Sequence, residues 1–119
     1  MTDSCVLLVE DEMCLAMMLE DVLAGAGYEV LCVSNLDAAE EIARKEPVDV
    51  AILDVNLGRG RHVYPLADEL DARGIRFMFT TAYDRSTLPE RFRDRPLLQK
   101  PYCPAAMVRT LGEVIAAAR

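Results

Sequence analysis

The stretch VDVAILDVNL at residues 48–57 decides the fold. Its first six residues, Val48–Leu53, are almost continuously apolar, which is typical of a strand that is buried on both faces. This strand is predicted to end at Asp54. A second apolar run, VLLV at 6–9, has the same form and leads directly into the acidic triplet Glu10-Asp11-Glu12. Such strands are characteristic of parallel sheets that are covered by helices on both faces.

The rest of the chain alternates short apolar runs with segments of helical period. Three further strands are predicted at 30–33, 77–79 and 97–98. Five successive strand–helix units predict the α/β class, as a flavodoxin-like, doubly wound (βα)5 sandwich with a parallel five-stranded sheet of order 2-1-3-4-5. In such a sheet the functional crevice lies beyond the carboxyl ends of the strands. Helices are predicted at 15–26, 36–43, 63–70 and 107–118, with a short additional helix at 86–93 that contains Pro89.

Length and composition favour one domain over residues 1–119 and exclude several classes of function. The net charge of −7 argues against nucleic-acid binding as the main role. No early apolar run is long enough for a signal peptide or a membrane span, so we expect a cytoplasmic protein without membrane association. The four cysteines do not have the spacing of a zinc site or a disulfide framework. We expect buried or half-buried free thiols at Cys5, Cys14, Cys32 and Cys103.

Polar side chains follow four of the predicted strands at the same edge of the sheet. Glu10 and Asp11 follow the first strand, and Asp54 ends the third. Neighbouring strands lie about 5 Å apart, so these carboxylates face one crevice, where a hard divalent cation such as Mg²⁺ relieves their repulsion. Thr81 adds a hydroxyl after the fourth strand, and Lys100, one of two lysines in the chain, adds a compact cation after the fifth. Together these groups predict a site for a phosphoryl group, with a carboxylate as the nucleophile.

Each of these residues, taken alone, has a simpler interpretation. Asp54 fits a helix cap or a turn, and the acidic triplet fits a solvated loop at a helix N-terminus. Thr81 alone fits a turn, and Lys100 alone fits a surface charge. Their joint placement at four strand ends favours the phosphoryl site.

Over essentially its whole length the sequence resembles the CheY-like receiver domains of two-component response regulators. VLLVEDE at 6–12 resembles the strand that delivers their acidic pair, and VDVAILDVNL at 48–57 resembles the strand that ends in the phosphorylated aspartate. Thr81-Ala82 resembles the hydroxyl and small residues after the fourth strand, and Lys100-Pro101-Tyr102 resembles the Lys-Pro-aromatic motif, whose Lys-Pro bond is often cis.

The resemblance implies a role for each matched residue. Asp54 is implied to be the phosphoacceptor and a metal ligand, and Asp11 a direct ligand of Mg²⁺, for which Mn²⁺ can substitute. Glu10, where the family often has Asp, would hold the metal through water. Three more roles follow: Asn56 offers its backbone carbonyl to the metal, Thr81 hydrogen-bonds the phosphoryl group, and Lys100 binds one of its oxygens.

The sequence departs from the common receiver pattern at two places. The aromatic switch residue that many receivers carry three positions before the lysine is Leu97 here. FMFTTAYDR at 77–85 instead resembles a receiver subgroup, often single-domain, that has a Phe-x-Thr-small-aromatic signature. This resemblance predicts that Tyr83 is the switch aromatic. The alternative is that Tyr83 is an ordinary amphipathic loop residue. The second departure is Gly58-Arg59-Gly60-Arg61, which predicts a more mobile loop after the third strand.

The implied function is a phosphorylation-switched signalling protein that is not an enzyme beyond its own phosphorylation and dephosphorylation. The implied partner is a sensor histidine kinase, of the HWE/HisKA2 type for this subgroup, or a histidine phosphotransfer protein, with output by protein contact or onward phosphotransfer. Two rivals remain. A haloacid dehalogenase-type phosphatase wants a second acid at the position of Asn56 and a larger chain, whereas a scaffold that works unphosphorylated has no need of the acidic, Thr and Lys set.

Charge is unevenly distributed along the chain. Residues 1–50 hold 12 acidic and 2 basic residues, whereas 51–119 hold 8 acidic and 11 basic residues. Five arginines fall in the region of the expected output face, which predicts either a partner with an acidic docking surface or an ordinary solvated face. These arginines are Arg85, Arg91, Arg93, Arg95 and Arg109.

Overall fold

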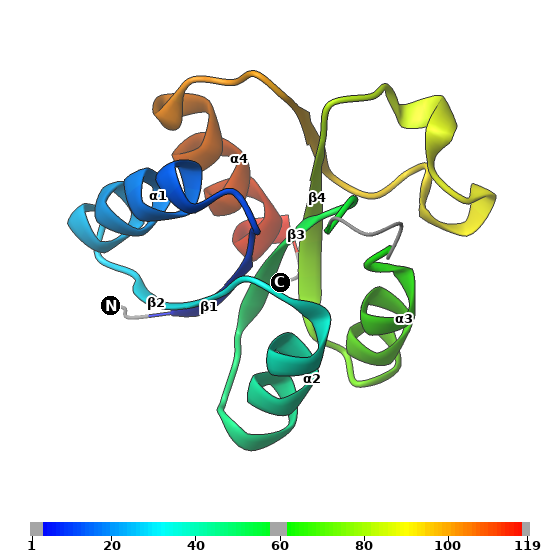
Figure 1. Cartoon of the computed structure of the whole chain (residues 1–119), viewed down its shortest axis with the longest axis horizontal. Coiled ribbons are helices and arrows are strands. Elements are labelled where there is room, and N and C mark those ends of the chain that lie inside the picture. Colours follow the sequence, from blue (N-terminus) through cyan, green and yellow to red (C-terminus); the bar gives the residue numbers. More distant parts are fainter. Residues whose placement is uncertain (1–3, 58–61, 118–119) are drawn as a thin grey trace.

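The apolar runs of the sequence form a five-stranded parallel sheet (Figure 1). The computed structural model describes residues 4–57 and 62–117. Every residue of the first and third strands, which lie next to the predicted crevice, is buried, because helices cover both faces of the sheet. The order is β2-β1-β3-β4-β5, as predicted. The strands are β1 (Cys5–Val9), β2 (Glu29–Val33), β3 (Val50–Asp54), β4 (Arg76–Thr81) and β5 (Leu97–Gln99).

Within the described residues, four α-helices cover the sheet in two pairs (Figure 1). Helices α1 (Met13–Gly25) and α4 (Pro104–Ala117) pack on one face, and α2 (Leu36–Lys45) and α3 (Tyr64–Ala72) pack on the other. Each pair closes its own apolar core against the sheet, because strand side chains alternate between the two faces. The fold is therefore the three-layered α/β sandwich that the sequence predicts.

The helices end where the sequence changes character. The Asn35 side chain accepts a hydrogen bond from the Ala38 N–H at 2.8 Å and caps α2. Glu46 leaves α2 in an extended conformation, since the residue before a proline is disfavoured in the helical region. Gly27 and Gly74 follow α1 and α3 with φ of 101° and 74°, a region that glycine enters without steric cost.

The predicted helix at 86–93 is wrong. The chain instead forms two short 3-10 turns, η1 (Arg85–Thr87) and η2 (Glu90–Phe92). Pro89 separates them, because it has no N–H to donate and it holds Leu88 extended at φ −75° and ψ 151°. The fourth strand–helix unit therefore has no α-helix, and the expected output face lacks one as well.

Arginines attach this β4–β5 connection, residues 82–96, to α3. The Arg91 guanidinium donates two hydrogen bonds to Asp68, at 2.9 and 2.8 Å. Arg95 donates to Asp71 at 2.9 Å. Phe92, between them in sequence, is buried in the core. Two of the arginines expected on a free basic face are thus paired within the molecule, which removes much of the reason to expect an acidic partner there.

The four cysteines form no disulfide, as predicted, but they are not all buried. Cys5 is buried and Cys32 half-buried, whereas Cys14 and Cys103 are exposed because the first turn of α1 and the residue before α4 face solvent. The Gly58–Arg61 loop and residue 118 of the last predicted helix lie outside the described residues. In the part of the chain that the structure describes, no helix has the length and apolar character needed to cross a bilayer.

Candidate functional site

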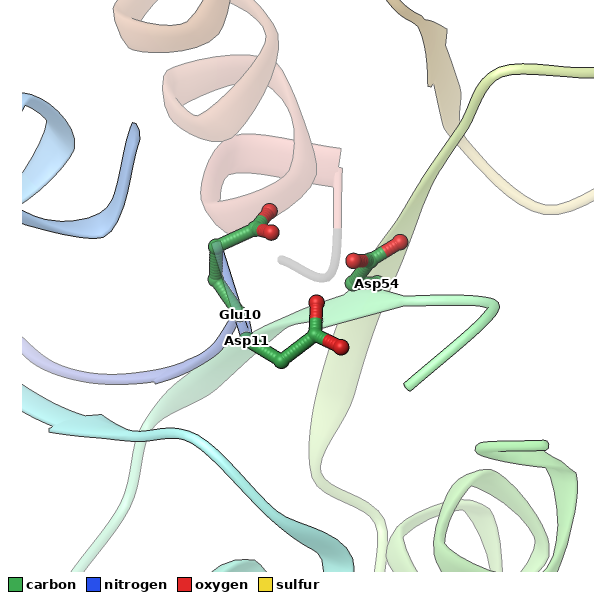
Figure 2. A group of neighbouring side chains, drawn as sticks. All are labelled: Glu10, Asp11 and Asp54. Carbon is green, nitrogen blue, oxygen red and sulfur yellow. The ribbon is translucent and has the colours of Figure 1, made fainter. Parts of the chain in front are cut away.

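Strand register brings three carboxylates together at one edge of the sheet. Val9 at the end of β1 pairs with Leu53 in β3, so the next residues, Glu10 and Asp54, lie side by side. Asp11 follows Glu10 and turns toward the same space (Figure 2). Each of Glu10, Asp11 and Asp54 offers an oxygen atom within 4.8 Å of the other two. The crevice predicted between the first and third strands is present.

These carboxylates differ in their exposure to solvent. Glu10 and Asp54 are only 2% and 4% exposed, whereas Asp11 is exposed. Burial raises the pKa of Asp54 from an ordinary 3.8 to about 7; the negative charge of Glu10 adds to this rise, and the positive charge of Lys100 opposes it. Asp54 is therefore a carboxyl group that is costly to ionise without more positive charge nearby.

Lys100 supplies positive charge from the end of β5. Its Nζ lies 3.3 Å from Asp54 Oδ2 and 3.2 Å from Glu10 Oε1. Burial lowers the pKa of Lys100, but the charges of Asp54 and Glu10 outweigh it and raise this pKa on balance. Lys100 is thus a largely buried cation that is shared by two acids, rather than a surface charge. The Lys100-Pro101 bond is cis.

Thr81 ends β4 next to this group. It is buried, and its main-chain carbonyl accepts a hydrogen bond from the Lys100 N–H at 2.7 Å. Its side-chain Oγ1 accepts one from the Tyr83 N–H at 3.1 Å. The Tyr83 side chain is 58% exposed. The threonine hydroxyl therefore stabilises the turn after β4, and the tyrosine stands out from that turn.

Asn56 and Leu97 are the remaining positions singled out in the sequence. Asn56 lies two residues beyond Asp54 and forms an isolated antiparallel bridge with His62. Its predicted metal contact is through the main-chain carbonyl, and this role stays a prediction. Leu97 pairs with Phe79 in the sheet, and aromatic packing in this region comes from a different set of residues. That set is Tyr64, Phe77, Phe79 and Phe92, whose ring centroids lie 5.3–6.1 Å apart in contacting pairs.

The donor set fits a hard divalent cation. Carboxylate oxygens are the ligands that Mg²⁺ and Mn²⁺ prefer, and three of them converge here. A cation at this position also removes the repulsion between Glu10, Asp11 and Asp54 that Lys100 alone only partly offsets. These residues could therefore hold such an ion.

Two grooves flank α1 beside the carboxylates. One, of about 400 Å³, lies between α1 and the start of α2, and both Glu10 and Asp11 line it. The other, of about 360 Å³, lies between α1 and the Lys100–Tyr102 segment. The helix between them exposes 70% of Met13 and 60% of Met17. The sequence indicated α1 as a helix but gave no sign of this exposed apolar surface.

The environment of Tyr102, the aromatic residue of the Lys-Pro-aromatic motif, is the other feature that the sequence did not reveal. Tyr102 follows the cis peptide bond, and its ring packs against the apolar core beneath α1 and α4. Its hydroxyl is buried, and it has no hydrogen-bond partner within the described part of the chain. Only its position directly after Lys100-Pro101 could have drawn attention to it.

Comparison with known proteins supports a common origin for this arrangement. The family model for the response regulator receiver domain matches residues 6–108. The solution structure of SdrG from Sphingomonas melonis Fr1 is 38% identical, covers 95% of this chain and 97% of its own, and has a TM-score of 0.82. The solution structure of the BeF3-activated conformation of SdrG, from Pseudomonas melonis Fr1, is 37% identical, with 96% and 98% coverage and a TM-score of 0.81.

A chemotaxis protein shows the same fold. The structure of the chemotaxis response regulator CheY4 of Vibrio cholerae is 26% identical, covers 95% of this chain and 99% of its own, and has a TM-score of 0.81. A search of curated protein sequences gave no match. The chain thus belongs to the response regulator receiver domains, which are phosphoacceptor signalling modules rather than enzymes.

Proposed function

We propose that this chain is a phosphorylation-switched signalling protein of a two-component system or phosphorelay, and that Asp54 is its phosphoacceptor. One observation carries the proposal: Lys100 Nζ lies 3.3 Å from Asp54 and 3.2 Å from Glu10, inside a group of three carboxylates that fits a divalent cation. The proposal treats residues 1–119 as one receiver domain.

The chemistry is phosphoryl transfer from a phosphohistidine to the Asp54 carboxylate. An Asp54 oxygen attacks phosphorus, a P–O bond forms, and the P–N bond breaks with its electron pair left on the histidine nitrogen, which takes up a proton. A divalent cation held by Glu10, Asp11 and Asp54, with the Asn56 carbonyl as a further ligand, would supply positive charge that favours the ionised carboxylate and neutralises the phosphoryl oxygens.

Two residues of this chain stabilise the transferring group. Lys100 turns from the carboxylates to a phosphoryl oxygen, which it binds as a point charge. The Thr81 hydroxyl accepts a hydrogen bond from the Tyr83 N–H and donates none to another described residue, so its own proton can go to a second oxygen. If it moves toward the phosphoryl group, the turn that carries Tyr83 loses this contact and its population of conformations shifts.

The switch resets by hydrolysis. Water attacks phosphorus, the bond between phosphorus and the Asp54 oxygen breaks, and the carboxylate is restored as inorganic phosphate leaves. Each cycle restores the chain and consumes one molecule of phosphodonor, whose phosphoryl group ends as inorganic phosphate. The donor carries a P–N bond, whereas a phosphatase of the haloacid dehalogenase type would take a phosphate ester.

The donor is a sensor histidine kinase, for which the sequence favours the HWE/HisKA2 type, or a histidine phosphotransfer protein. We place the docking surface for the donor on α1, where Met13 and Met17 offer exposed, adaptable apolar surface beside Glu10 and Asp11. The proposal places this exchange in the cytoplasm, where the four free cysteines remain reduced.

Intact mass spectrometry tests the proposal. The full chain is incubated with Mg²⁺ and phosphoramidate, a small P–N donor, beside Asp54→Asn and the matched control Asp21→Asn, which changes an exposed aspartate of α1. We expect one added phosphoryl group on the wild type and on Asp21→Asn. Asp54→Asn, and the wild type in excess EDTA, should gain none.

Other outcomes identify the rivals. If the folded wild type gains no phosphoryl group from phosphoramidate or from purified HWE/HisKA2 kinases, the protein is a scaffold that works unphosphorylated. If an aryl phosphate ester is turned over continuously, it is a phosphatase. If Asp54→Asn is phosphorylated as fully as the wild type, the acceptor is another residue.

A further inference from the structure

The groove between α1 and the start of α2 follows one ridge of the helix. Four of its lining residues lie at positions i, i+3, i+4 and i+7, which share one face of an α-helix. They are Met13, Ala16, Met17 and Glu20. At the α-helical rise per residue this ridge is about 10 Å long. The groove of about 400 Å³ thus extends from the carboxylates of the site along α1 as far as Glu20.

Much of the lining of this groove is apolar. Met13 and Met17 border it with exposed side chains, Ala16 is buried, and Val33 at the end of β2 is half-buried. The thioether side chains of methionine are flexible and polarisable, so they adapt to ligands of different shape. The groove therefore offers a long side chain an adaptable apolar surface.

The charge of the groove is negative and has no internal counterion. Its charged lining residues are Glu10, Asp11 and Glu20, and no lysine or arginine of the described chain lines it. Glu20 forms no ion pair or side-chain hydrogen bond with another described residue. The two basic residues that precede β3, Arg44 and Lys45, lie in the last turn of α2, and each pairs with a glutamate outside the groove. A cation that neutralises Glu20 must therefore come from another molecule.

The Cys32 thiol senses this negative charge. Cys32 is half-buried and lines the groove. Burial raises its pKa, and the charges of Glu20 and Glu10 raise it further. Two carboxylates that are ten positions apart in the chain thus act on one group in the groove.

The two ends of the groove suit different ligands. Glu10 and Asp11 stand at the carboxyl edge of the sheet, where they could hold a divalent cation, and the N-terminus of α2 disfavours further positive charge nearby. The start of β2 pairs with the start of β1, so α1, which connects these strands, runs from the carboxyl edge to the opposite edge. Glu20 lies along this path, away from the metal-side carboxylates. It is the acid that remains for an external cation when a metal is bound.

We propose that this groove binds an arginine side chain of the protein that docks on α1, with the arginine stem along Met13 and Met17 and the guanidinium on Glu20. Arginine fits both parts of the lining, because its stem packs on apolar surface while its weakly hydrated head pairs with a carboxylate. A hydrated metal ion would make no use of the apolar walls. The inference rests on the proposed function, in which a phosphodonor docks on α1, and deepens it by naming the chemistry that this donor presents.

N-acetylarginine amide, which carries the side chain without charged termini, is the probe. The full chain is titrated in saturating Mg²⁺, at constant ionic strength adjusted with NaCl, and its main-chain amides are followed by ¹H–¹⁵N NMR. We expect saturable shifts at Ala16, Met17 and Val33. The citrulline analogue, which has nearly the same shape but no charge, should cause none. Glu20→Gln should weaken binding of the probe about two- to fivefold, as loss of one exposed ion pair requires.

Asp21→Asn is the matched control. It removes the same charge from the next residue of α1, which is exposed but does not line the groove. This variant should bind the probe as the wild type does. Phosphoramidate should label Glu20→Gln as fully as the wild type, because Glu20 lies outside the group of three carboxylates around Asp54.

Failure of this inference is distinguishable from failure of the proposed function. Shifts that grow without saturation, equal affinity of the wild type and Glu20→Gln, or equal binding of the citrulline analogue each overturn the arginine site and leave phosphorylation of Asp54 in place. Saturable shifts confined to Glu10 and Asp11 also overturn it, because the probe then competes for the metal site. A wild type that binds the probe in the groove but is not labelled by phosphoramidate or kinases keeps the arginine site and overturns the proposed function.

Discussion

Asp54 is subject to opposing electrostatic effects in the unphosphorylated protein. Burial and the neighbouring charge of Glu10 favour its neutral form, whereas Lys100 at 3.3 Å favours the ionised form. The first two effects are larger, because the pKa is raised to about 7. A nucleophile in this state becomes fully ionised only when further positive charge arrives, which links its reactivity to cation binding.

The raised pKa of Asp54 predicts how stability depends on pH. In EDTA the native carboxyl keeps its proton up to about pH 7, whereas the unfolded one loses it near 3.8. The native state thus binds more protons in this window, so the free energy of unfolding falls as pH rises from about 4 to about 7. Asp54→Asn has no such proton, and it should become more stable than the wild type by roughly 2–4 kcal/mol at pH 8.

Urea unfolding at a series of pH values between 4 and 8 measures this difference. Asp21→Asn, which changes an exposed aspartate on α1, should differ from the wild type by an amount that does not vary with pH. If the curves of Asp54→Asn and the wild type run parallel across the whole range, Asp54 is not protonated in the native state and its ordinary pKa is retained.

The β4–β5 connection is an element whose shape depends on its side chains. Its two 3-10 turns provide few internal hydrogen bonds, so other contacts must hold it. Arg85 donates to the carbonyls of Arg93 and Arg95, and Arg93 donates to the carbonyl of Leu88. Arg91 and Arg95 then bind α3 and lie over aromatic rings. Arginine suits these roles because its planar fork makes several hydrogen bonds at once.

Removing the acid that Arg91 binds should loosen this element locally. Asp68→Asn is expected to reduce global stability by less than about 1 kcal/mol, because the ion pair is about half exposed. The larger effect is local opening, so amide hydrogens of the connection should exchange several-fold faster. Phe92, whose N–H donates to the Pro89 carbonyl, and Arg95, whose N–H donates to Phe92, are the reporters.

Glu41→Gln is the control for that change. It breaks an ion pair of similar exposure, with Lys45 on α2, that holds no loop in place. Exchange in the β4–β5 connection should not change in this variant. Unchanged exchange in Asp68→Asn as well would show that burial of Leu88 and Phe92 alone fixes the connection.

At the scale of the whole molecule, the site exists only when the sheet is folded, so ligand binding and global stability are coupled. β1 and β3 are neighbouring interior strands of the sheet, and both apolar cores pack against them. The acids at their carboxyl ends come together only when these strands are paired in register. A ligand of those acids therefore binds the folded chain and not the unfolded one, and it must stabilise the whole fold.

Mg²⁺ is accordingly expected to raise the unfolding midpoint. At a concentration ten times its dissociation constant the gain is about 1.4 kcal/mol. Asp11→Asn removes the exposed member of the carboxylate group and should lose most of this gain while folding normally in EDTA. Thermal unfolding with increasing MgCl₂, at constant ionic strength adjusted with NaCl, measures it.

Asp21→Asn again provides the control, because it lowers the negative charge of the chain by the same amount outside the site. It should gain as much stability from Mg²⁺ as the wild type does. Equal gains for all three proteins would mean that Mg²⁺ acts through general screening of negative charge, and that the carboxylate group is not a specific cation site.

The sequence by itself was sufficient for the class of fold, the strand order and most of the candidate site. Runs such as Val6–Val9 are continuously apolar because both faces of the strand are buried, and this pattern is local in the chain. Once the order of parallel strands is known, Glu10, Asp11, Asp54 and Lys100 must meet, since strand ends share one edge. These predictions needed only the pattern of apolar residues along the chain and the usual strand order of a doubly wound parallel sheet.

Only the tertiary structure decided the conformation after β4 and the environment of the Tyr102 hydroxyl. The segment 86–93 has a helical pattern, but Pro89 interrupts it and two turns form instead. Arg91 and Arg95 favour these turns because they bind Asp68 and Asp71, which lie 23 and 24 positions earlier in the chain. The Tyr102 hydroxyl is unpaired because packing against α1 and α4 excludes it from water without an acceptor in reach. Both depend on distances between residues far apart in the chain, and such distances are set by packing rather than by local sequence.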